Sequence, residues 1–175
     1  MIEGSNFPEV LPVPLQELVD YWAGKRSSLG RLPALGDINL MDLYKLAPHL
    51  FICDRVIDET GNPRYLWRYW GTALASFTKF DATGKYLEES HEEDAIERAS
   101  RMYGWVLDNA EPNYQKLRIS VVGSLDRSWD YERVVVPLAN KDGAPGHILG
   151  TYVSGFEKDS KSLPYISLQF DSVDN

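Results

Sequence analysis

The 175-residue chain has little cysteine, a deficit of positive charge and no long apolar run. Its single cysteine, Cys53, excludes an internal disulfide and a zinc site built on several thiolates. Eighteen lysines and arginines stand against 26 aspartates and glutamates, and a formal net charge of -8 disfavours binding to nucleic acid or to anionic lipid. No run approaches the roughly 20 apolar residues of a membrane helix, and the N-terminus lacks signal-peptide features. We therefore expect a cytoplasmic protein without a nucleic-acid or membrane partner.

Sequence motifs of the common enzyme classes are also missing. The chain has no G-x-x-x-x-G-K-S/T phosphate loop, no G-x-G-x-x-G, no G-x-S-x-G nucleophile elbow and no H-E-x-x-H zinc pair. Its three histidines, His49, His91 and His147, are scattered along the sequence. The acidic residues that follow His91 suit the first turn of a helix, where they complement the helix dipole. We therefore expect no catalytic residue and no metal site.

What the chain does contain is enough apolar material for one folded core, with 43% hydrophobic and 12% aromatic residues. A first helix is predicted from Pro14 to Ala23, because proline suits the first turn of a helix. Helical spacing places four large apolar residues of this segment on one stripe: Leu15, Leu18, Val19 and Trp22. The stripe predicts a surface that packs against a partner or against the chain's own sheet.

Extended segments account for much of the remaining chain. Residues 50–58 and 64–70 flank the turn-forming sequence D-E-T-G-N-P and predict a β-hairpin. A long amphipathic helix is predicted over 90–110, with Ser90 and Glu93 as its capping box. Three later strands are predicted at 117–122, 129–138 and 147–156, and alternation at 165–170 leaves a sixth strand open. This order predicts an α+β fold with one antiparallel sheet whose single face is covered by helices.

Large aromatic side chains are concentrated between residues 67 and 105. Core packing explains such a block, and so does a partly apolar cavity lined by large side chains with polar atoms at their tips. The sequence leaves both explanations open.

Several motifs in this part of the chain resemble the PAS domain family, specifically a bacterial single-domain subfamily. The matching residues fall in three groups: Pro48, His49 and Leu50; Arg68, Gly71 and Thr72; and Asp81, Thr83, Gly84 and Leu87. Ala47 and Lys79–Phe80 depart from the subfamily pattern, and a later match lies at Pro137 and Leu138. The similarity spans about 32–156, so we expect an N-terminal extension at 1–31, a PAS-like sensory domain at 32–157 and a C-terminal tail at 158–175.

The resemblance implies a PAS-like five-stranded antiparallel sheet with helices on one face, and a sensory module instead of an enzyme. It implies a small molecule between sheet and helices, a signalling protein partner bound in trans, and a homodimer formed through the N-terminal helix. It also turns Trp67 and Tyr69 inward and Arg68 outward, where we expect a structural ion pair. The side chains expected to bind the ligand are Trp67, Tyr69, Phe77, Phe80, Met102, Trp105, Ile119 and Val121.

The ligand itself stays unidentified at this stage. Flavin photosensors of the light-oxygen-voltage type need a cysteine in a helical Asn-Cys-Arg-Phe motif, whereas Cys53 lies in a predicted strand. A chromophore of the photoactive-yellow-protein type needs a cysteine in a loop beside a glutamate, and this chain lacks that arrangement. Both photosensor classes are therefore disfavoured.

Two alternatives compete with the sensory interpretation. One is a cone-shaped α+β isomerase or hydrolase in which Asp54 or Asp130 acts as the base, and it requires a carboxylate of raised pKa in an apolar cavity. The other is a ligand-free interaction domain with a filled core. A carboxylate buried in a cavity would favour the enzyme, an exposed carboxylate would favour the sensory module, and a core without a cavity would favour the interaction domain.

Overall fold

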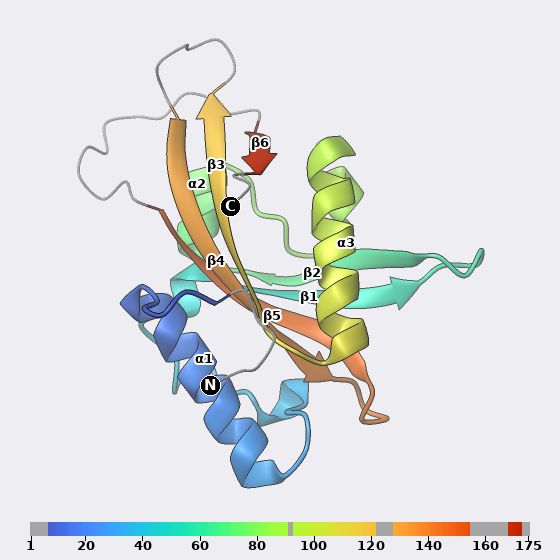
Figure 1. The fold of residues 1–175 in the computed structure, drawn as a ribbon. Coiled ribbons are helices and arrows are strands. Elements are labelled where there is room, and N and C mark those ends of the chain that lie inside the picture. The colour runs from blue at the N-terminus through green and yellow to red at the C-terminus, as the bar shows by residue number, and fades with distance from the viewer. Residues whose placement is uncertain (1–6, 91–92, 122–127, 155–167, 173–175) are drawn as a thin grey trace.

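The computed structural model describes residues 7–90, 93–121, 128–154 and 168–172, which form an α+β domain around one antiparallel sheet (Figure 1). The strand order is β2-β1-β5-β4-β3-β6, so the predicted five-stranded sheet carries the sixth strand that the sequence left open. The elements are α1 (Val13–Leu29), η1 (Leu35–Asp37), η2 (Ala47–His49), β1 (Leu50–Ile57), β2 (Pro63–Trp70), α2 (Thr72–Thr78), η3 (Leu87–Glu89), α3 (Glu93–Asn109), β3 (Asn113–Val121), β4 (Ser128–Ala139), β5 (Pro145–Ser154) and β6 (Leu168–Ser172).

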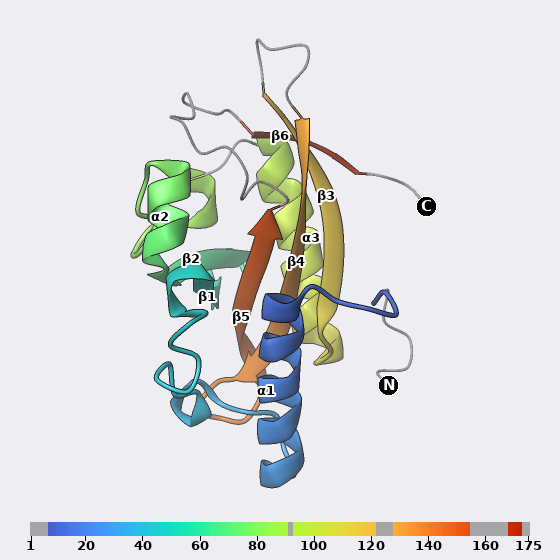
Figure 2. The same cartoon turned by 90° about the vertical axis from the view of Figure 1, so that its left-hand side faces the viewer.

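Helices lie on both faces of the sheet, with α1 on one side and α3 on the other (Figure 2). The inner core lies between the sheet and helices α2 and α3, and it includes Phe51, Trp67, Leu74, Met102, Tyr103, Val135 and Ile148. The outer core lies between the sheet and α1, and it includes Leu15, Leu18, Val19, Trp22, Leu50, Ile52, Val136 and Leu149. The apolar stripe of α1 therefore covers the chain's own sheet, one of the two alternatives that the sequence left open.

The long amphipathic helix is confirmed, and its described bounds are Glu93–Asn109. Ser90 ends η3, where its hydroxyl donates to the carbonyl of Leu87 at 3.0 Å and accepts the indole N–H of Trp67 at 2.9 Å. Ser90 is thus engaged by a distant tryptophan. His91 and Glu92 lie outside the described residues.

A β-bulge divides strand β2 at Arg68. Along β1, Ile52 pairs with Tyr69 and Cys53 pairs with Trp67, so Arg68 has no partner of its own. An extra residue reverses the alternation of side chains after it. Trp67 therefore enters the inner core, whereas Tyr69 packs against the outer core and donates to a backbone carbonyl there. The prediction that Trp67 and Tyr69 turn inward together is wrong for this reason.

Candidate functional site

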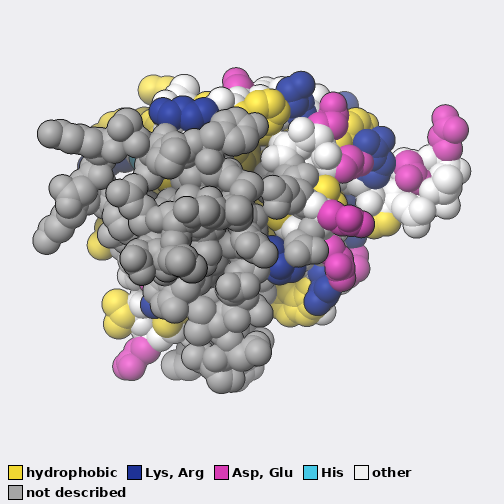
Figure 3. Space-filling view, turned by 90° about the horizontal axis from the view of Figure 1, so that it is seen from above, with side chains coloured by type: hydrophobic (Ala, Val, Ile, Leu, Met, Phe, Trp, Pro, Cys, Tyr) yellow, Lys and Arg dark blue, Asp and Glu magenta, His cyan; other side chains and the backbone are white. Residues whose placement is uncertain are grey.

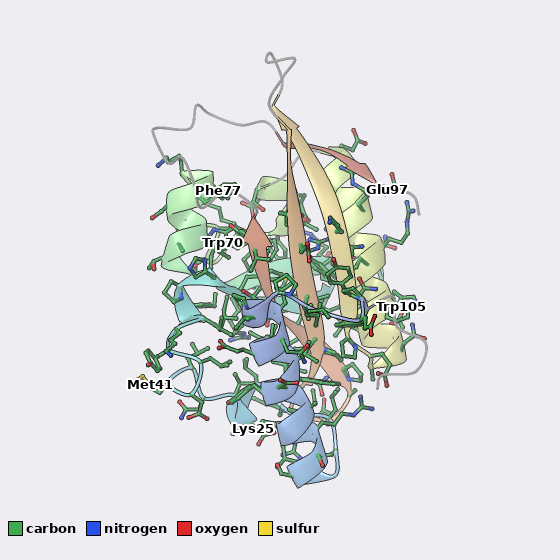
Figure 4. All side chains as sticks on the ribbon, turned by 60° about the vertical axis from the view of Figure 1, so that its left-hand side comes forward. Lys25, Met41, Trp70, Phe77, Glu97 and Trp105 are labelled. Carbon is green, nitrogen blue, oxygen red and sulfur yellow. The ribbon has the colours of Figure 1, made fainter. Side chains whose placement is uncertain are left out.

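The candidate functional site is an aromatic cluster in the inner core, formed by Phe51 of β1, Trp67 and Trp70 of β2, and Tyr103 of α3. Ring centroids are 4.8 Å apart between Trp67 and Trp70, 5.5 Å between Phe51 and Trp67, and 6.2 Å between Trp67 and Tyr103. The first three rings of this cluster are brought together by the pairing of β1 with β2, and α3 adds the fourth. Phe77 belongs to α2, and Trp70 lies close to this helix in Figure 4.

Two of the polar atoms around the aromatic cluster have protein partners, and one does not. The indole N–H of Trp67 donates to Ser90, and the hydroxyl of Tyr65 donates to the carbonyl of Ser100 at 3.3 Å. The indole nitrogen of Trp70 is buried and has no acceptor among the described residues. An unsatisfied buried donor costs about 1–3 kcal/mol, and most such groups in proteins find a partner. The indole N–H of Trp70 thus remains available to an acceptor that the described residues do not supply.

Only part of the predicted binding set meets at this cluster. Trp67 and Met102 are buried in the inner core, and the half-buried Phe77 ring lies 6.2 Å from the ring of Tyr152. Phe80 is 38% exposed and Trp105 is 42% exposed, so neither lies within the core. The side chains of Ile119 and Val121, on β3, are outside the description.

The exposure of Trp105 follows from its position on α3. The buried residues of this helix are Ala95, Ala99, Met102, Tyr103, Val106 and Leu107, which define one stripe. Trp105 lies off that stripe, on the solvent side of the helix (Figure 4). Tyr103, which the binding prediction omitted, lies on the stripe, and its helical periodicity was the signal that could have identified it.

Phe51 and Trp70 were also missing from the predicted binding set. Alternation along β1 places Phe51 on the same face as Cys53, and the sequence alone predicts this alternation. Trp70 shares a face with Trp67 only because the bulge at Arg68 lies between them. No local sequence pattern indicates that bulge.

The ionisable groups of the inner core are held in their uncharged forms. Burial raises the pKa of Tyr65 to about 12 and raises the pKa of Tyr103 further. Burial also raises the pKa of the Cys53 thiol well above its ordinary value, with the nearby charges of Asp54 and Glu88 acting in the same direction. A buried thiol of this kind is a poor nucleophile. The described groups of the cluster present apolar rings and one hydrogen-bond donor without an acceptor, but no activated nucleophile.

A polar cluster lies on the opposite face of the sheet and consists of Asp54, Arg68 and His147. Asp54 is 6% exposed; its Oδ1 atom is 2.9 Å from Nε of Arg68 and 2.7 Å from Nδ1 of His147. A second contact of 2.5 Å joins Oδ2 of Asp54 to Arg68. The ion pair expected for Arg68 is thus confirmed, with the bulge residue reaching across to β1.

The charge state of Asp54 bears on the enzyme alternative. Burial opposes ionisation, but hydrogen bonds from His147 and Arg68 outweigh it and hold the pKa of Asp54 below the ordinary aspartate value. A catalytic base in an apolar cavity would need the opposite shift. Asp130 lies on β4, and its side chain is outside the description.

Replacing Asp54 with asparagine is expected to lower the free energy of unfolding by about 2–4 kcal/mol at pH 7, because Arg68 and His147 lose a buried anionic partner. A depressed carboxyl pKa stabilises the fold above the unfolded pKa, and this contribution is lost as the pH falls through the folded value. Urea unfolding of both proteins should therefore show a difference that shrinks below about pH 4. Asp142→Asn, at an exposed turn, is the control and should change little. A difference for Asp54→Asn that is constant with pH would contradict the assignment.

Charged side chains elsewhere on the surface are mixed in sign. Acidic and basic groups lie next to one another on the described part of the surface in Figure 3. Arg64 pairs with Glu88, and Arg101 pairs with Glu97 at 2.7 Å. Among the described residues, no three His, Cys, Asp or Glu side chains are grouped as a metal ion would require. In the same residues, no helix has the length and apolar character needed to cross a bilayer.

Comparison with known proteins identifies the family. Residues 11–153 match the PAS domain family model, so the chain belongs to the PAS domain family. Domains of this family are typically sensory and not catalytic. A search of curated proteins finds no match.

Solved structures with a similar arrangement share little sequence with the chain. A LOV protein of Rhodobacter sphaeroides is 14% identical, with a TM-score of 0.44 and coverage of 69% of this chain and 70% of the other. A sensory box sensor histidine kinase from Vibrio cholerae is 14% identical, with a TM-score of 0.43 and coverage of 77% and 97%. The PAS domain of BvgS from Bordetella pertussis is 16% identical, with a TM-score of 0.36 and coverage of 65% and 84%.

Proposed function

We propose that this protein is a sensory PAS module that binds a small molecule at the aromatic cluster and signals in trans to a protein partner. The observation that carries the proposal is the buried indole N–H of Trp70, which lacks an acceptor among the described residues. A ligand with a hydrogen-bond acceptor would satisfy this donor and offset its desolvation cost.

The surroundings of Trp70 indicate the kind of molecule that fits. Its nearest ring partners are Trp67 and Phe51, and all members of the cluster are uncharged. An ion would lose its hydration there without gaining a counter-charge from the cluster. We therefore propose that the ligand is neutral and largely apolar. A flat ring would stack on the aromatic faces of the cluster, and one hydrogen-bond acceptor would be directed at Trp70.

Signalling would begin at the helices that cover the cluster. Tyr103 belongs both to the cluster and to α3, so a guest that displaces this ring acts directly on the helix. A ligand shifts the protein between conformations only by its different affinity for each. The predicted homodimer through α1 would have to use the exposed face of that helix, because its apolar stripe is buried.

Replacing Trp70 with phenylalanine tests the proposal, because it removes the N–H and keeps an aromatic ring. We expect native mass spectrometry of wild-type protein purified from its own host to detect a low-mass adduct. Losing one hydrogen bond to a buried donor should weaken binding about tenfold, so the adduct should be depleted in Trp70→Phe. Trp105→Phe, on the solvent side of α3, is the matched control and should retain it.

The ring contacts that form the cluster also support a second candidate, a ligand-free interaction domain with a filled core. Two results together would favour this candidate. Wild-type protein would carry no adduct, and no neutral aromatic compound in a screening panel would raise its thermal stability. Equal adducts in wild type and Trp70→Phe would leave binding in place and overturn the role of Trp70.

A further inference from the structure

One side chain joins the two helices that cover opposite faces of the sheet. Arg26, in the last turn of α1, places Nη1 3.3 Å from the carbonyl oxygen of Ala110 and 3.3 Å from Oε1 of Glu111. Ala110 and Glu111 connect α3 to β3. Arg26 therefore reaches around the sheet from the outer core to the end of the helix that covers the inner core.

The connection that Arg26 contacts has an unusual backbone. Ala110 has a φ of 54°, in the left-handed region that residues with a Cβ atom seldom adopt. Glycine is the usual residue at such a helix end, and alanine there costs conformational free energy. A contact that satisfies the carbonyl of Ala110 helps to hold the strained turn in place.

Arg26 is itself positioned by the outer core. Its guanidinium carbon lies 5.1 Å from the centre of the Trp22 ring, and the indole N–H of Trp22 donates to the carbonyl of Pro137 at 2.8 Å. Pro137 belongs to β4, in the middle of the sheet. A chain of contacts thus runs from β4 through Trp22 and Arg26 of α1 to Ala110 at the end of α3.

We propose that Arg26 is a latch that couples the last turn of α1 to the end of α3. The side chains of Arg26 and Glu111 are each 39% exposed, and ion pairs of this kind are weak enough to open without unfolding the protein. A displacement of α3 would move the strained turn at Ala110, break the contact and release the end of α1. Opening of the latch by a bound ligand rests on the proposed function, whereas the contact between Arg26 and the end of α3 can be tested without any ligand.

Hydrogen exchange of the full chain, followed by mass spectrometry, tests the latch in Arg26→Gln. We expect amides in both 25–29 and 107–111 to exchange about threefold faster or more, because each segment loses its contact with the other. Arg31→Gln is the matched control: it removes the same charge and an ion pair of 2.8 Å with Asp37, but Arg31 has no hydrogen bond or ion pair with α3 among the described residues. This control should leave 107–111 unchanged. Urea unfolding of each variant separates the local change from global destabilisation, which accelerates exchange throughout.

Coupling must also be reciprocal. Glu111→Gln removes the partner of Arg26 on the α3 side. As a single substitution it should accelerate exchange of the amides in 25–29. Added to Arg26→Gln, it should accelerate that exchange little further. Faster exchange confined to 25–29 in Arg26→Gln would overturn the proposal, as would fully additive effects of the two substitutions. Neither outcome depends on a ligand, so failure of the latch is distinguishable from failure of the Trp70 experiment.

Discussion

Replacing Gly71 with alanine is expected to destabilise the protein by about 3 kcal/mol or more, or to prevent folding. A Cβ atom at this position would lie 2.2 Å from the carbonyl oxygen of Pro48 and 2.5 Å from its carbon. These are backbone atoms, so no rotamer change can relieve the overlap. Gly71 also donates its N–H to Leu50 at 2.9 Å, which holds the start of α2 against the start of β1. Urea unfolding followed by circular dichroism measures the effect.

The same substitution elsewhere should have the opposite sign. Gly24 lies in the exposed interior of α1, where an added Cβ would meet no atom within 4 Å. Gly24→Ala should stabilise the protein by about 0.5–1 kcal/mol, because alanine loses less backbone entropy in a helix. If Gly71→Ala unfolds at the same urea concentration as the wild type, the close approach of Gly71 to Pro48 is wrong.

Replacing Phe51 with alanine should cost about 3–5 kcal/mol, the usual range for truncating a buried phenylalanine. Phe51 is 3% exposed, and its ring centroid lies 5.5 Å from that of Trp67 and 6.2 Å from that of Trp70. The substitution removes the ring that joins β1 to the other members of the aromatic cluster. Chemical denaturation gives the change in the free energy of unfolding.

Gly150 provides a matched partner for this experiment. It pairs with Phe51 across β1 and β5, and a Cβ on Gly150 would lie 2.2 Å from the Phe51 ring. Gly150→Ala alone should therefore cost about 1–3 kcal/mol through overpacking, whereas in the Phe51→Ala background it should cost little. A double-mutant cycle measures this coupling. Strictly additive effects would show that the Phe51 ring does not lie over Gly150.

Much of the fold was predictable because its signals are local. The stripe of α3 follows the helical repeat, and the hairpin of β1 and β2 follows from alternation around the turn at 58–62. Periodicity of this kind depends only on neighbours in the sequence, and it persists whatever the element packs against. The α+β class and the antiparallel sheet follow from the order of those elements.

The candidate site was less predictable, because it depends on residues far apart in the chain. Met102 was predicted from the aromatic block and lies in the inner core, but Trp105 of the same helix points to solvent. Tyr69 was assigned to the wrong face, because one unpaired residue in β2 reverses the alternation. Local composition marked the right region without showing which side chains meet there.

The amino-acid sequence by itself determined the helices and strands, their order and the apolar face of each, since these depend on residue type and short spacing. Tertiary structure alone decided that α1 covers the outer face of its own sheet, that Asp54 meets His147 across 93 positions, and that the indole N–H of Trp70 is buried without an acceptor among the described residues. These outcomes depend on strand register and on packing between distant segments. Such pairings lower the free energy only when the whole chain is folded, so no local stretch of sequence encodes them.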